Sequence, residues 1–313
     1  MNLKKPKFWD FKKPNLIAYI LLPFAFLLQN LNNILRRNNP YKFKIKTVCV
    51  GNIYIGGTGK TPTTIKLYEI LKKLNFKVST AKKFYKSQVD ENLILEKKTS
   101  FISGLSRKEI IKKAIKNKQN LIIFDDGLQD RSVFYDLKFV CFDAEKFIGN
   151  GLLIPSGPLR ENLNSLNKYD CVFLKSNNKI NNDNLDLIKK NNNKIKIFET
   201  YLKIENLKSF DLTKEYLIFS GIGNHESFKE ILIDNQFNIK NEIIFPDHHN
   251  YKDHELKKII EKAKISKLKI ITTEKDYVKI SKTLANDINF IDVKTYIKDE
   301  EKLTNFIKKK LNV

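Results

Sequence analysis

The sequence predicts an α/β protein with parallel sheets flanked by helices, a second and smaller α/β domain, and a separate helix at the N-terminus. Three observations predict this class. Short apolar runs typical of strands alternate with segments of helical periodicity along most of the 313 residues. A glycine-rich turn joins one early strand-like run to the helix-like segment after it, and the alternation begins again beyond residue 200. The composition, 42% hydrophobic and 11% aromatic, is that of a chain able to bury a core in each domain.

The first expected element is an apolar helix over residues 15–35. Its uninterrupted apolar stretch, Leu16 to Leu28, has 13 residues, fewer than the roughly 20 that a membrane-spanning helix needs. No small-residue cleavage site follows it, which argues against a signal peptide. Aromatic and basic residues lead into the helix and a basic pair follows it: Phe8, Trp9, Phe11, Lys12 and Lys13, then Arg36 and Arg37. We therefore expect residues 1–40 to form a membrane-associated helix in an anionic interface, with a buried hairpin or core helix as the alternative.

The glycine-rich turn, residues 51–62, lies between a strand expected at Ile45–Val50 and a helix expected at Thr61–Leu74. Such a turn directs several backbone N–H groups and the positive end of a helix toward one point, which favours a phosphate group. Lys60 would reach the β- and γ-phosphates of a nucleotide, and the Thr61 hydroxyl would bind Mg²⁺. The turn therefore predicts a P-loop NTPase-like domain that uses ATP and Mg²⁺, a plain turn being the alternative. The expected nucleotide contacts in the loop are Ile53, Tyr54, Ile55, Gly56, Gly57, Thr58, Gly59, Lys60 and Thr61.

Three further apolar runs are typical of buried strands: Leu121–Phe124, Lys138–Phe142 and Asp170–Leu174. Asp125 and Asp126 directly follow the first of these runs. A P-loop requires an acidic residue at the end of a neighbouring strand to complete its metal site. The two aspartates are therefore expected metal ligands, although capping of the next element would also explain a carboxylate pair at this position.

A second α/β pattern follows the first. A surface helix is expected within Ile180–Lys196 and an extended linker from Phe198 to Glu215. Strand-like runs then occur at Tyr216, at Ile243–Phe245 and at Lys269–Thr272, and a helix is expected over Asp299–Leu311. We therefore expect one domain at residues 41–200 and a smaller one at 201–313.

The formal net charge of +23 comes almost entirely from Lys. Because Asn and Ile are also abundant, most of this charge is explained by compositional drift, and the remainder favours an anionic partner such as a phosphorylated ligand or an acidic membrane. No aromatic-interleaved basic motif or recognisable nucleic-acid module is present, so we do not expect nucleic-acid binding. Cys49, Cys141 and Cys171 have no C-x-x-C spacing, which predicts buried thiols in a reducing cytoplasm rather than disulfides or a zinc site.

Six segments, taken together in their order along the chain, resemble the tetraacyldisaccharide 4'-kinases of lipid A synthesis, a membrane-associated branch of the P-loop kinases. The family loop reads V-G-N-x-x-x-G-G-x-G-K-T-P and lacks the first Gly of the common P-loop pattern, as this chain does at Tyr54. The matching segments are Val50–Pro62, Asp125–Gln129, Pro155–Glu161, Gly221–Asn224, Asp247–His249 and Thr273–Asp276. The similarity runs from about Leu16 to Asp276 and so covers most of the chain.

Three positions depart from the family pattern. Asp130 stands where the D-D-G-L-Q-H motif has His. The S-R-G-Y segment corresponds to Lys82–Tyr85, which loses the Arg and Gly although Lys83 keeps a positive charge. The G-D-E-P segment corresponds to Val89–Asn92, which keeps both acidic residues.

The resemblance implies transfer of the γ-phosphate of ATP to the 4'-hydroxyl of tetraacyldisaccharide 1-phosphate, which gives lipid IVA. It implies a monomer at the cytoplasmic face of the inner membrane, held peripherally or by a single helix. The alternative from another class is a regulatory NTPase or nucleotide-gated membrane adaptor that hydrolyses ATP without a small-molecule acceptor.

The resemblance also implies roles for individual residues. Asp90 would accept the proton of the sugar hydroxyl and His248 would orient it, with His249 as the other candidate. Arg160 would contact the triphosphate. The implied metal set is Thr61, Asp125, Asp126, Gln129 and Glu161. Thr273–Asp276 would line the nucleotide base or a cleft between the domains.

Overall fold

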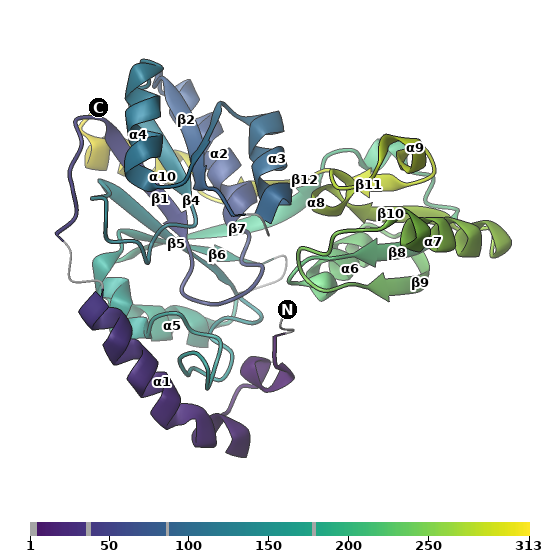
Figure 1. Cartoon of the computed structure of the whole chain (residues 1–313), viewed down its shortest axis with the longest axis horizontal. Helices are drawn as coiled ribbons and strands as arrows, with labels where there is room; N and C mark the ends of the chain where they lie inside the picture. The colour runs from purple at the N-terminus through teal and green to yellow at the C-terminus, as the bar shows by residue number, and fades with distance from the viewer. Residues whose placement is uncertain (1–4, 36–38, 86–87, 177–179) are drawn as a thin grey trace. The chain divides into compact units, whose positions relative to one another are not determined.

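The computed structural model describes residues 5–35, 39–85, 88–176 and 180–313 (Figure 1). Arg36 and Arg37, the basic pair expected after the first helix, lie outside these ranges. The chain forms two compact units, and each is described separately below. The large unit comprises residues 5–84, 99–201 and 295–313, and the small unit comprises 85–98 and 202–294. Two segments thus differ from the division expected at residue 200: residues 85–98 belong to the small unit and residues 295–313 to the large one.

The large unit is built on an eight-stranded sheet in the order β12-β7-β6-β5-β1-β4-β2-β3. Neighbouring strands from β7 to β3 pair in parallel throughout. Since parallel strands present their carboxyl ends at one edge of a sheet, the residues after β1 and β4 lie near each other. The strands are β1 (Lys46–Gly51), β2 (Val78–Lys83), β3 (Phe101–Gly104), β4 (Leu121–Asp125), β5 (Leu137–Asp143), β6 (Cys171–Lys175), β7 (Lys196–Ile204) and β12 (Val293–Ile297).

Helices cover both faces of this sheet. Alternate residues of the central strands point to opposite faces, so that Phe124 belongs to one hydrophobic core and Ile123 to the other. The first core is closed by α4 (Arg107–Lys116) and α5 (Asn182–Asn191), and the second by α2 (Lys60–Lys73) and α10 (Glu300–Leu311). The burial of Leu303, Ile307 and Leu311 in the second core explains why the last helix belongs to the large unit. A short 3-10 helix, η3 (Leu163–Lys168), precedes β6.

Most expected elements are confirmed within one or two residues at each end, but the linker expected from Phe198 is wrong. Residues 196–200 form part of β7 and pair in parallel with β6. In this part of the strand Phe198 and Thr200 are buried and Glu199 between them is not. Such an alternating, half-polar strand near a sheet edge has a weak hydrophobic signal, which explains the error. The prediction of buried thiols is confirmed, because Cys49, Cys141 and Cys171 are all buried and free.

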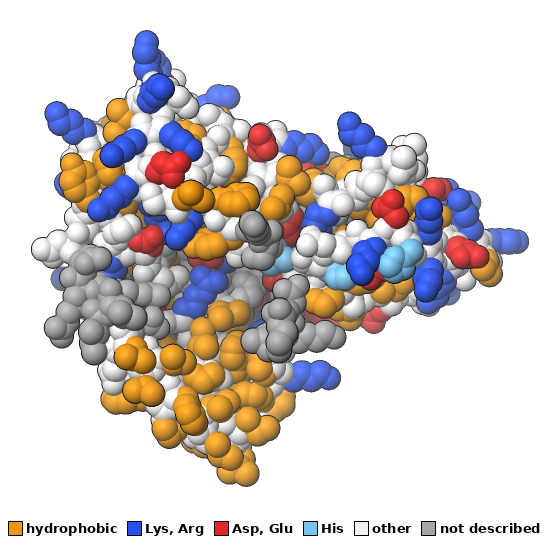
Figure 2. All heavy atoms as spheres, in the orientation of Figure 1, with side chains coloured by type: hydrophobic (Ala, Val, Ile, Leu, Met, Phe, Trp, Pro, Cys, Tyr) orange, Lys and Arg blue, Asp and Glu red, His pale blue; other side chains and the backbone are white. Residues whose placement is uncertain are grey.

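The N-terminal segment contains a 3-10 helix, η1 (Lys7–Asp10), followed by α1 (Leu16–Leu35). Among residues 16–31 of α1, whose side chains the structure describes, Ala18 and Ala25 are buried and face the protein. Figure 2 shows hydrophobic side chains gathered over this helix. The large exposed ones are Leu16, Ile17, Tyr19, Ile20, Leu22, Phe24, Phe26, Leu27, Leu28 and Leu31. Within the described ranges, no helix combines the length and hydropathy needed to cross a bilayer. Trp9, expected to face the membrane, is instead 9% exposed, because it packs against the large unit.

The small unit is a second α/β layer structure, with a four-stranded parallel sheet in the order β11-β10-β8-β9. Its strands are β8 (Glu215–Ser220), β9 (Asn238–Ile244), β10 (Lys269–Thr273) and β11 (Asn289–Ile291). One face packs against α7 (Asp253–Ile265) and the other against α6 (His225–Asp234). The remaining helices are α3 (Val89–Lys98), η4 (Leu207–Ser209), α8 (Glu274–Tyr277) and α9 (Lys282–Ala285). Lys98 links α3 to the rest of this unit, because its Nζ lies 2.5 Å from Glu274 Oε2 and 2.7 Å from Asp292 Oδ1.

Candidate active site

The glycine-rich turn connects β1 to α2 in the large unit. Gly56 and Gly59 have φ values of 138° and 78°, a region of backbone conformation that favours glycine. No side chain caps the N-terminus of α2, so its first N–H groups are available to an anion. Asn52 closes the turn internally, because its Nδ2 donates to the carbonyl oxygen of Tyr54 at 2.6 Å and to Thr58 Oγ1 at 3.1 Å. Asn52 has a structural role in the loop that we did not assign from the sequence, although it is part of the matching motif.

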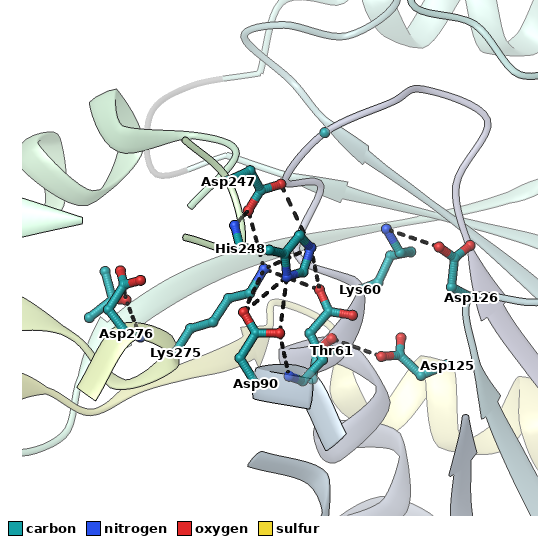
Figure 3. Close-up of polar contacts among 12 residues, drawn as sticks. Lys60, Thr61, Asp90, Asp125, Asp126, Asp247, His248, Lys275 and Asp276 are labelled. Atoms are coloured by element: carbon teal, nitrogen blue, oxygen red, sulfur yellow. Dashed lines mark hydrogen bonds and ion pairs between the residues drawn. The ribbon is translucent and has the colours of Figure 1, made fainter. Parts of the chain in front are cut away.

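The side chains of the loop divide into two groups. Ile53, Tyr54 and Thr58 are almost completely buried, so any contact that these residues make with a nucleotide is through their backbone. Lys60 and Thr61 begin α2 and point toward the end of β4 (Figure 3). The expected contacts are therefore of two kinds, with the N–H groups supplied by the loop and the side-chain chemistry by the first turn of the helix.

Asp125 ends β4 and Asp126 follows it, beside this helix end. Thr61 Oγ1 donates to Asp125 Oδ2 at 2.8 Å, and Lys60 Nζ lies 3.8 Å from Asp126 Oδ2 (Figure 3). Asp126 has a φ of 60°, and its N–H donates to the carbonyl oxygen of Val50 at 2.8 Å. This bond between the ends of β4 and β1 turns the chain so that consecutive aspartates point to different parts of the site.

Positive charges dominate the environment of Asp126. Arg160 Nη1 donates to its carboxylate at 2.9 and 3.2 Å. Burial alone would raise the pKa of Asp126, but the charges of Lys60, Arg160 and Lys82 outweigh it and lower the pKa to about 2. The carboxylate is therefore ionised at neutral pH.

The Pro/Gly loop that carries Arg160 is attached directly to the P-loop. The N–H of Ile55 donates to the carbonyl oxygen of Pro158 at 2.8 Å, and the N–H of Arg160 donates to that of Ile53 at 2.6 Å. The neighbouring Glu161 accepts from Gln129 Nε2 at 3.1 Å. The expected metal and phosphate residues of the large unit thus form two groups of contacts. Thr61 bonds to Asp125, and the second group comprises Lys60, Asp126, Arg160, Gln129 and Glu161.

Two departures from the family pattern are also found here. Lys82, in the segment that loses Arg and Gly, is only 2% exposed, and its Nζ lies 3.4 Å from Asp125 Oδ2. Asp130, at the position of the family's His, forms an ion pair with Arg107. Arg107 Nη2 also donates to the carbonyl oxygen of Asp126 at 2.7 Å. We did not expect Lys82 beside a candidate metal ligand, because no local sequence pattern indicates that a lysine will be buried.

In the small unit the structure places Asp90 and His248 in contact. His248 Nδ1 lies 3.0 and 2.9 Å from the two carboxylate oxygens of Asp90, which is 2% exposed (Figure 3). His248 has a φ of 58°, and its N–H donates to the carbonyl oxygen of Gly221 at 3.0 Å. His249, the other candidate, instead stacks on Phe245. The pairing expected from the sequence is present, and the catalytic role of the two residues stays a prediction.

Lys275 and Lys279 surround the same carboxylate. Their Nζ atoms lie 3.7 and 3.8 Å from Asp90 Oδ2, and Lys275 Nζ also lies 3.2 Å from Glu91 Oε1. Burial would raise the pKa of Asp90, but the hydrogen bond from His248 and the two lysine charges outweigh it and hold the pKa below its usual value. The pair is thus an ionised carboxylate held by a hydrogen bond from an imidazole, and the carboxylate can accept a proton.

The T-E-K-D segment explains how Lys275 is placed. Thr273 caps the short helix α8, and its hydroxyl donates to Asp276 Oδ2 at 2.8 Å. Asp276 Oδ2 also accepts from the N–H of Gly221 at 2.9 Å, which links this helix to the turn that holds His248. We expected the segment to line a nucleotide base or a cleft, and we missed its contact with the Asp90–His248 pair.

The large unit has a phosphate-binding loop, with Lys60 and two aspartates at the end of a neighbouring strand. The small unit has a carboxylate that can accept a proton and an imidazole that holds it. Such a combination is that of a P-loop kinase. Comparison with known proteins identifies its family. The model of the tetraacyldisaccharide-1-P 4'-kinase family matches residues 17–312. The chain belongs to the tetraacyldisaccharide-1-P 4'-kinase family.

Individual relatives agree over nearly the whole length. The chain is 45% identical to a tetraacyldisaccharide 4'-kinase of Pelagibacter ubique (strain HTCC1062), with 97% of each chain covered. It is 35% identical to a tetraacyldisaccharide 4'-kinase of Rickettsia akari (strain Hartford), covering 100% of this chain and 99% of that one. The crystal structure of LpxK from Aquifex aeolicus in complex with ATP is similar with a TM-score of 0.70 at 21% identity, covering 94% of this chain and 99% of that one. This last similarity supports the fold.

Proposed function

We propose that this chain transfers the γ-phosphate of ATP to the 4'-hydroxyl of tetraacyldisaccharide 1-phosphate and so produces lipid IVA. The observation that carries the proposal is the P-loop with Lys60 and Thr61 beside Asp125 and Asp126, in a chain of this family. The relatives from P. ubique and R. akari carry the name of this activity.

The large unit would hold the triphosphate. The uncapped N-terminus of α2 and the backbone N–H groups of the glycine-rich turn form a cradle for phosphate oxygens. Lys60 and Arg160 would neutralise the charge that spreads over the transferred group, with Arg160 able to bind two oxygens at once. Because Asp126 holds both cations, they are positioned before a nucleotide arrives, which lowers the cost of organising the site.

The residues present fit a magnesium ion that is bound together with the nucleotide. The candidate ligands supply only oxygen atoms, the donor that Mg²⁺ prefers: Thr61, Asp125, Asp126, Gln129 and Glu161. In the part of the chain that the structure describes, no three His, Cys, Asp or Glu side chains form a cluster able to hold a metal. When bound, Mg²⁺ would supply charge neutralisation at the phosphates.

In the small unit, Asp90 would take the proton of the 4'-hydroxyl. Its depressed pKa keeps it ionised, and the N–H of His248 Nδ1 donates to it and holds the carboxylate in place to receive the proton. Lys275 Nζ lies 3.5 Å from His248 Nε2, so both nitrogens of the imidazole have a partner that fixes its orientation. His248 and Lys275 thus act as positioning residues for Asp90.

Residues 5–35 would associate with the cytoplasmic face of the inner membrane. Among residues 16–31 of α1, the buried side chains are those of Ala18 and Ala25, while large apolar side chains are exposed (Figure 2). Lys7, Lys12 and Lys13 are exposed just before it, where they can contact anionic headgroups. The test is a flotation assay with liposomes of anionic lipid. Replacing Leu16, Ile20 and Phe24 by Ser should move the protein from the floating liposome fraction to the bottom fraction. Retention on the liposomes would show that the membrane contact lies elsewhere.

The activity is tested with purified full-length protein, radiolabelled ATP and the disaccharide 1-phosphate in detergent micelles. We expect a lipid that carries label at the 4' position, and no labelled lipid from the Lys60→Met variant. Turnover of ATP without a labelled lipid would contradict the proposal and favour a regulatory NTPase.

A further inference from the structure

Tyr54 is an unusual residue for a phosphate-binding loop, since the common pattern has Gly at this position. Its side chain is 1% exposed and does not face the site. The ring lies beneath the turn, where a Cβ atom at Gly56 would be only 3.1 Å from Tyr54 Cε1. The conformation of the loop therefore depends on what holds this ring in place.

The Tyr54 hydroxyl is held by the segment that precedes α1. It donates to Asp10 Oδ1 and accepts from Lys5 Nζ, and the Lys5 ammonium lies 4.4 Å from the centre of the ring. Lys5 and Asp10 also form an ion pair with each other. Three polar groups thus meet at one point, and burial together with the neighbouring Asp10 raises the pKa of the Tyr54 hydroxyl.

The segment of residues 5–10 is itself fixed to the loops that build the site. Trp9 Nε1 donates to the carbonyl oxygen of Pro155 at 3.0 Å, and the carbonyl oxygen of Trp9 accepts from the N–H of Asn150 at 2.9 Å. A Cβ atom at Gly149 would lie 2.1 Å from that same carbonyl oxygen, so only glycine allows this approach. The segment therefore contacts both the P-loop and the Pro/Gly loop that carries Arg160.

We infer that residues 5–10 are part of the nucleotide site: through Tyr54 they hold the P-loop in its binding conformation, and Tyr54 is a positioning residue for ATP. The apparent dissociation constant of a ligand rises in proportion as the binding-competent fraction of its site falls. A loop released from Asp10 and Lys5 populates other conformations and binds ATP more weakly. Saturating ATP restores the bound conformation, so turnover at high ATP is affected little. The inference rests on the ATP binding proposed above and assigns to the N-terminal segment a role besides membrane contact.

The test is equilibrium binding of a non-hydrolysable ATP analogue with Mg²⁺ to the full-length protein, measured by calorimetry without lipid acceptor. Tyr54→Phe removes only the hydroxyl, and Asp10→Asn removes only the charge of its partner. Each should raise the Kd of the analogue about fivefold to tenfold, the usual effect of losing one hydrogen bond that is partly shielded from water. The double variant should bind no more weakly than the weaker single variant, because both substitutions break the same contact. In the kinase assay the KM for ATP should rise, while kcat at saturating ATP stays within about twofold.

Tyr216→Phe is the matched control. It also removes the hydroxyl of a buried tyrosine, which donates to the carbonyl oxygen of Asp211 at 2.8 Å in the small unit. We expect it to lower the unfolding temperature without changing the Kd of the analogue. An unchanged Kd in Tyr54→Phe, with an unfolding temperature lowered as in Tyr216→Phe, would show a purely structural contact and overturn the inference. Additive effects of Tyr54→Phe and Asp10→Asn would also overturn it. A wild-type chain that binds no analogue would overturn the proposed function as well.

Discussion

The charged groups of the large unit and those of the small unit are held in place by different kinds of structure. In the large unit, Asp125 ends a central buried strand and Lys60 begins a helix that packs on the sheet. In the small unit, His248 lies in a loop at a φ of 58° and Lys275 lies on the four-residue helix α8. The first set is fixed by elements that the core requires, and the second by hydrogen bonds among the site residues themselves.

This difference corresponds to two tasks of a phosphotransferase, the binding of a triphosphate and the acceptance of a proton. Binding a triphosphate requires preorganised positive charge and N–H groups, which a parallel sheet edge and a helix end supply at low cost. Accepting a proton requires a carboxylate whose protonation state is adjusted by its neighbours, and the neighbours of Asp90 are contributed by several segments. Substitutions in the first set should therefore affect nucleotide binding and transfer together, and those in the second set transfer alone.

Lys60→Met should have the largest effect. It removes the cation that would reach the β- and γ-phosphates, and we expect kcat/KM for ATP to fall about 10³-fold or more. Lys66→Met is the control, since Lys66 lies on the same helix but pairs with Glu300 at 2.8 Å. Steady-state kinetics with ATP and the disaccharide acceptor measure both. Equal activity of the two variants would show that the position of Lys60 has no special importance.

Asp90→Asn should lower kcat about 10²-fold, because the substituted amide cannot accept a proton. The Kd of an ATP analogue should stay near the wild-type value, since Asp90 belongs to the small unit and the P-loop to the large one. Glu96→Gln removes an exposed carboxylate from the same helix, α3, and should leave kcat unchanged. If Asp90→Asn weakens ATP binding as strongly as it slows turnover, the two tasks are not divided as described.

The same contrast explains which parts of the molecule could be predicted from sequence. The strand, loop and helix around Lys60 are contiguous, and the expected helix Thr61–Leu74 differs from α2 by one residue at each end. The two aspartates at the end of β4 could be predicted from the sequence because they directly follow an apolar run. The Asp90–His248 pair joins residues 158 positions apart, and only the resemblance to a family indicated it. Local sequence patterns do not indicate contacts between residues so far apart in the chain.

Other features were not predictable because their function depends on packing. Trp9 belongs by composition to a membrane-facing segment, yet its indole is buried against the large unit. Lys82 belongs by charge to the surface, yet it is buried beside Asp125. Lys275 was part of a recognised motif, but the direction of its side chain is determined by the cap of α8 and by Asp276. In each case the residue type is misleading because tertiary contacts outweigh its usual preference.

Asp126 should make the stability of the large unit dependent on acid. Its pKa is lowered to about 2 in the folded chain, from an ordinary value of 3.8. Its contribution to stability is therefore fully present above about pH 4 and is lost as the pH falls through the folded pKa, about 2 kcal/mol in all. Urea unfolding between pH 5 and pH 2 measures this loss, which should be absent from Asp126→Asn. A variant with the same acid dependence as the wild type would assign the effect to other carboxyl groups.

Lys275→Met should have the smallest effect, a change in pH dependence rather than a loss of activity. Lys275 is one of the charges that lower the pKa of Asp90, so its removal raises that pKa. Asp90 is active as the carboxylate, and activity falls as the pH drops through its pKa. The acidic limb of the kcat profile should therefore move to higher pH, with kcat at pH 8 reduced only a few-fold. Lys229→Met removes a small-unit lysine that pairs with Glu242 at 2.9 Å, and it should leave the limb in place. If the acidic limb of Lys275→Met lies at the same pH as in the wild type, the lysines around Asp90 hold the loops together and do not lower its pKa.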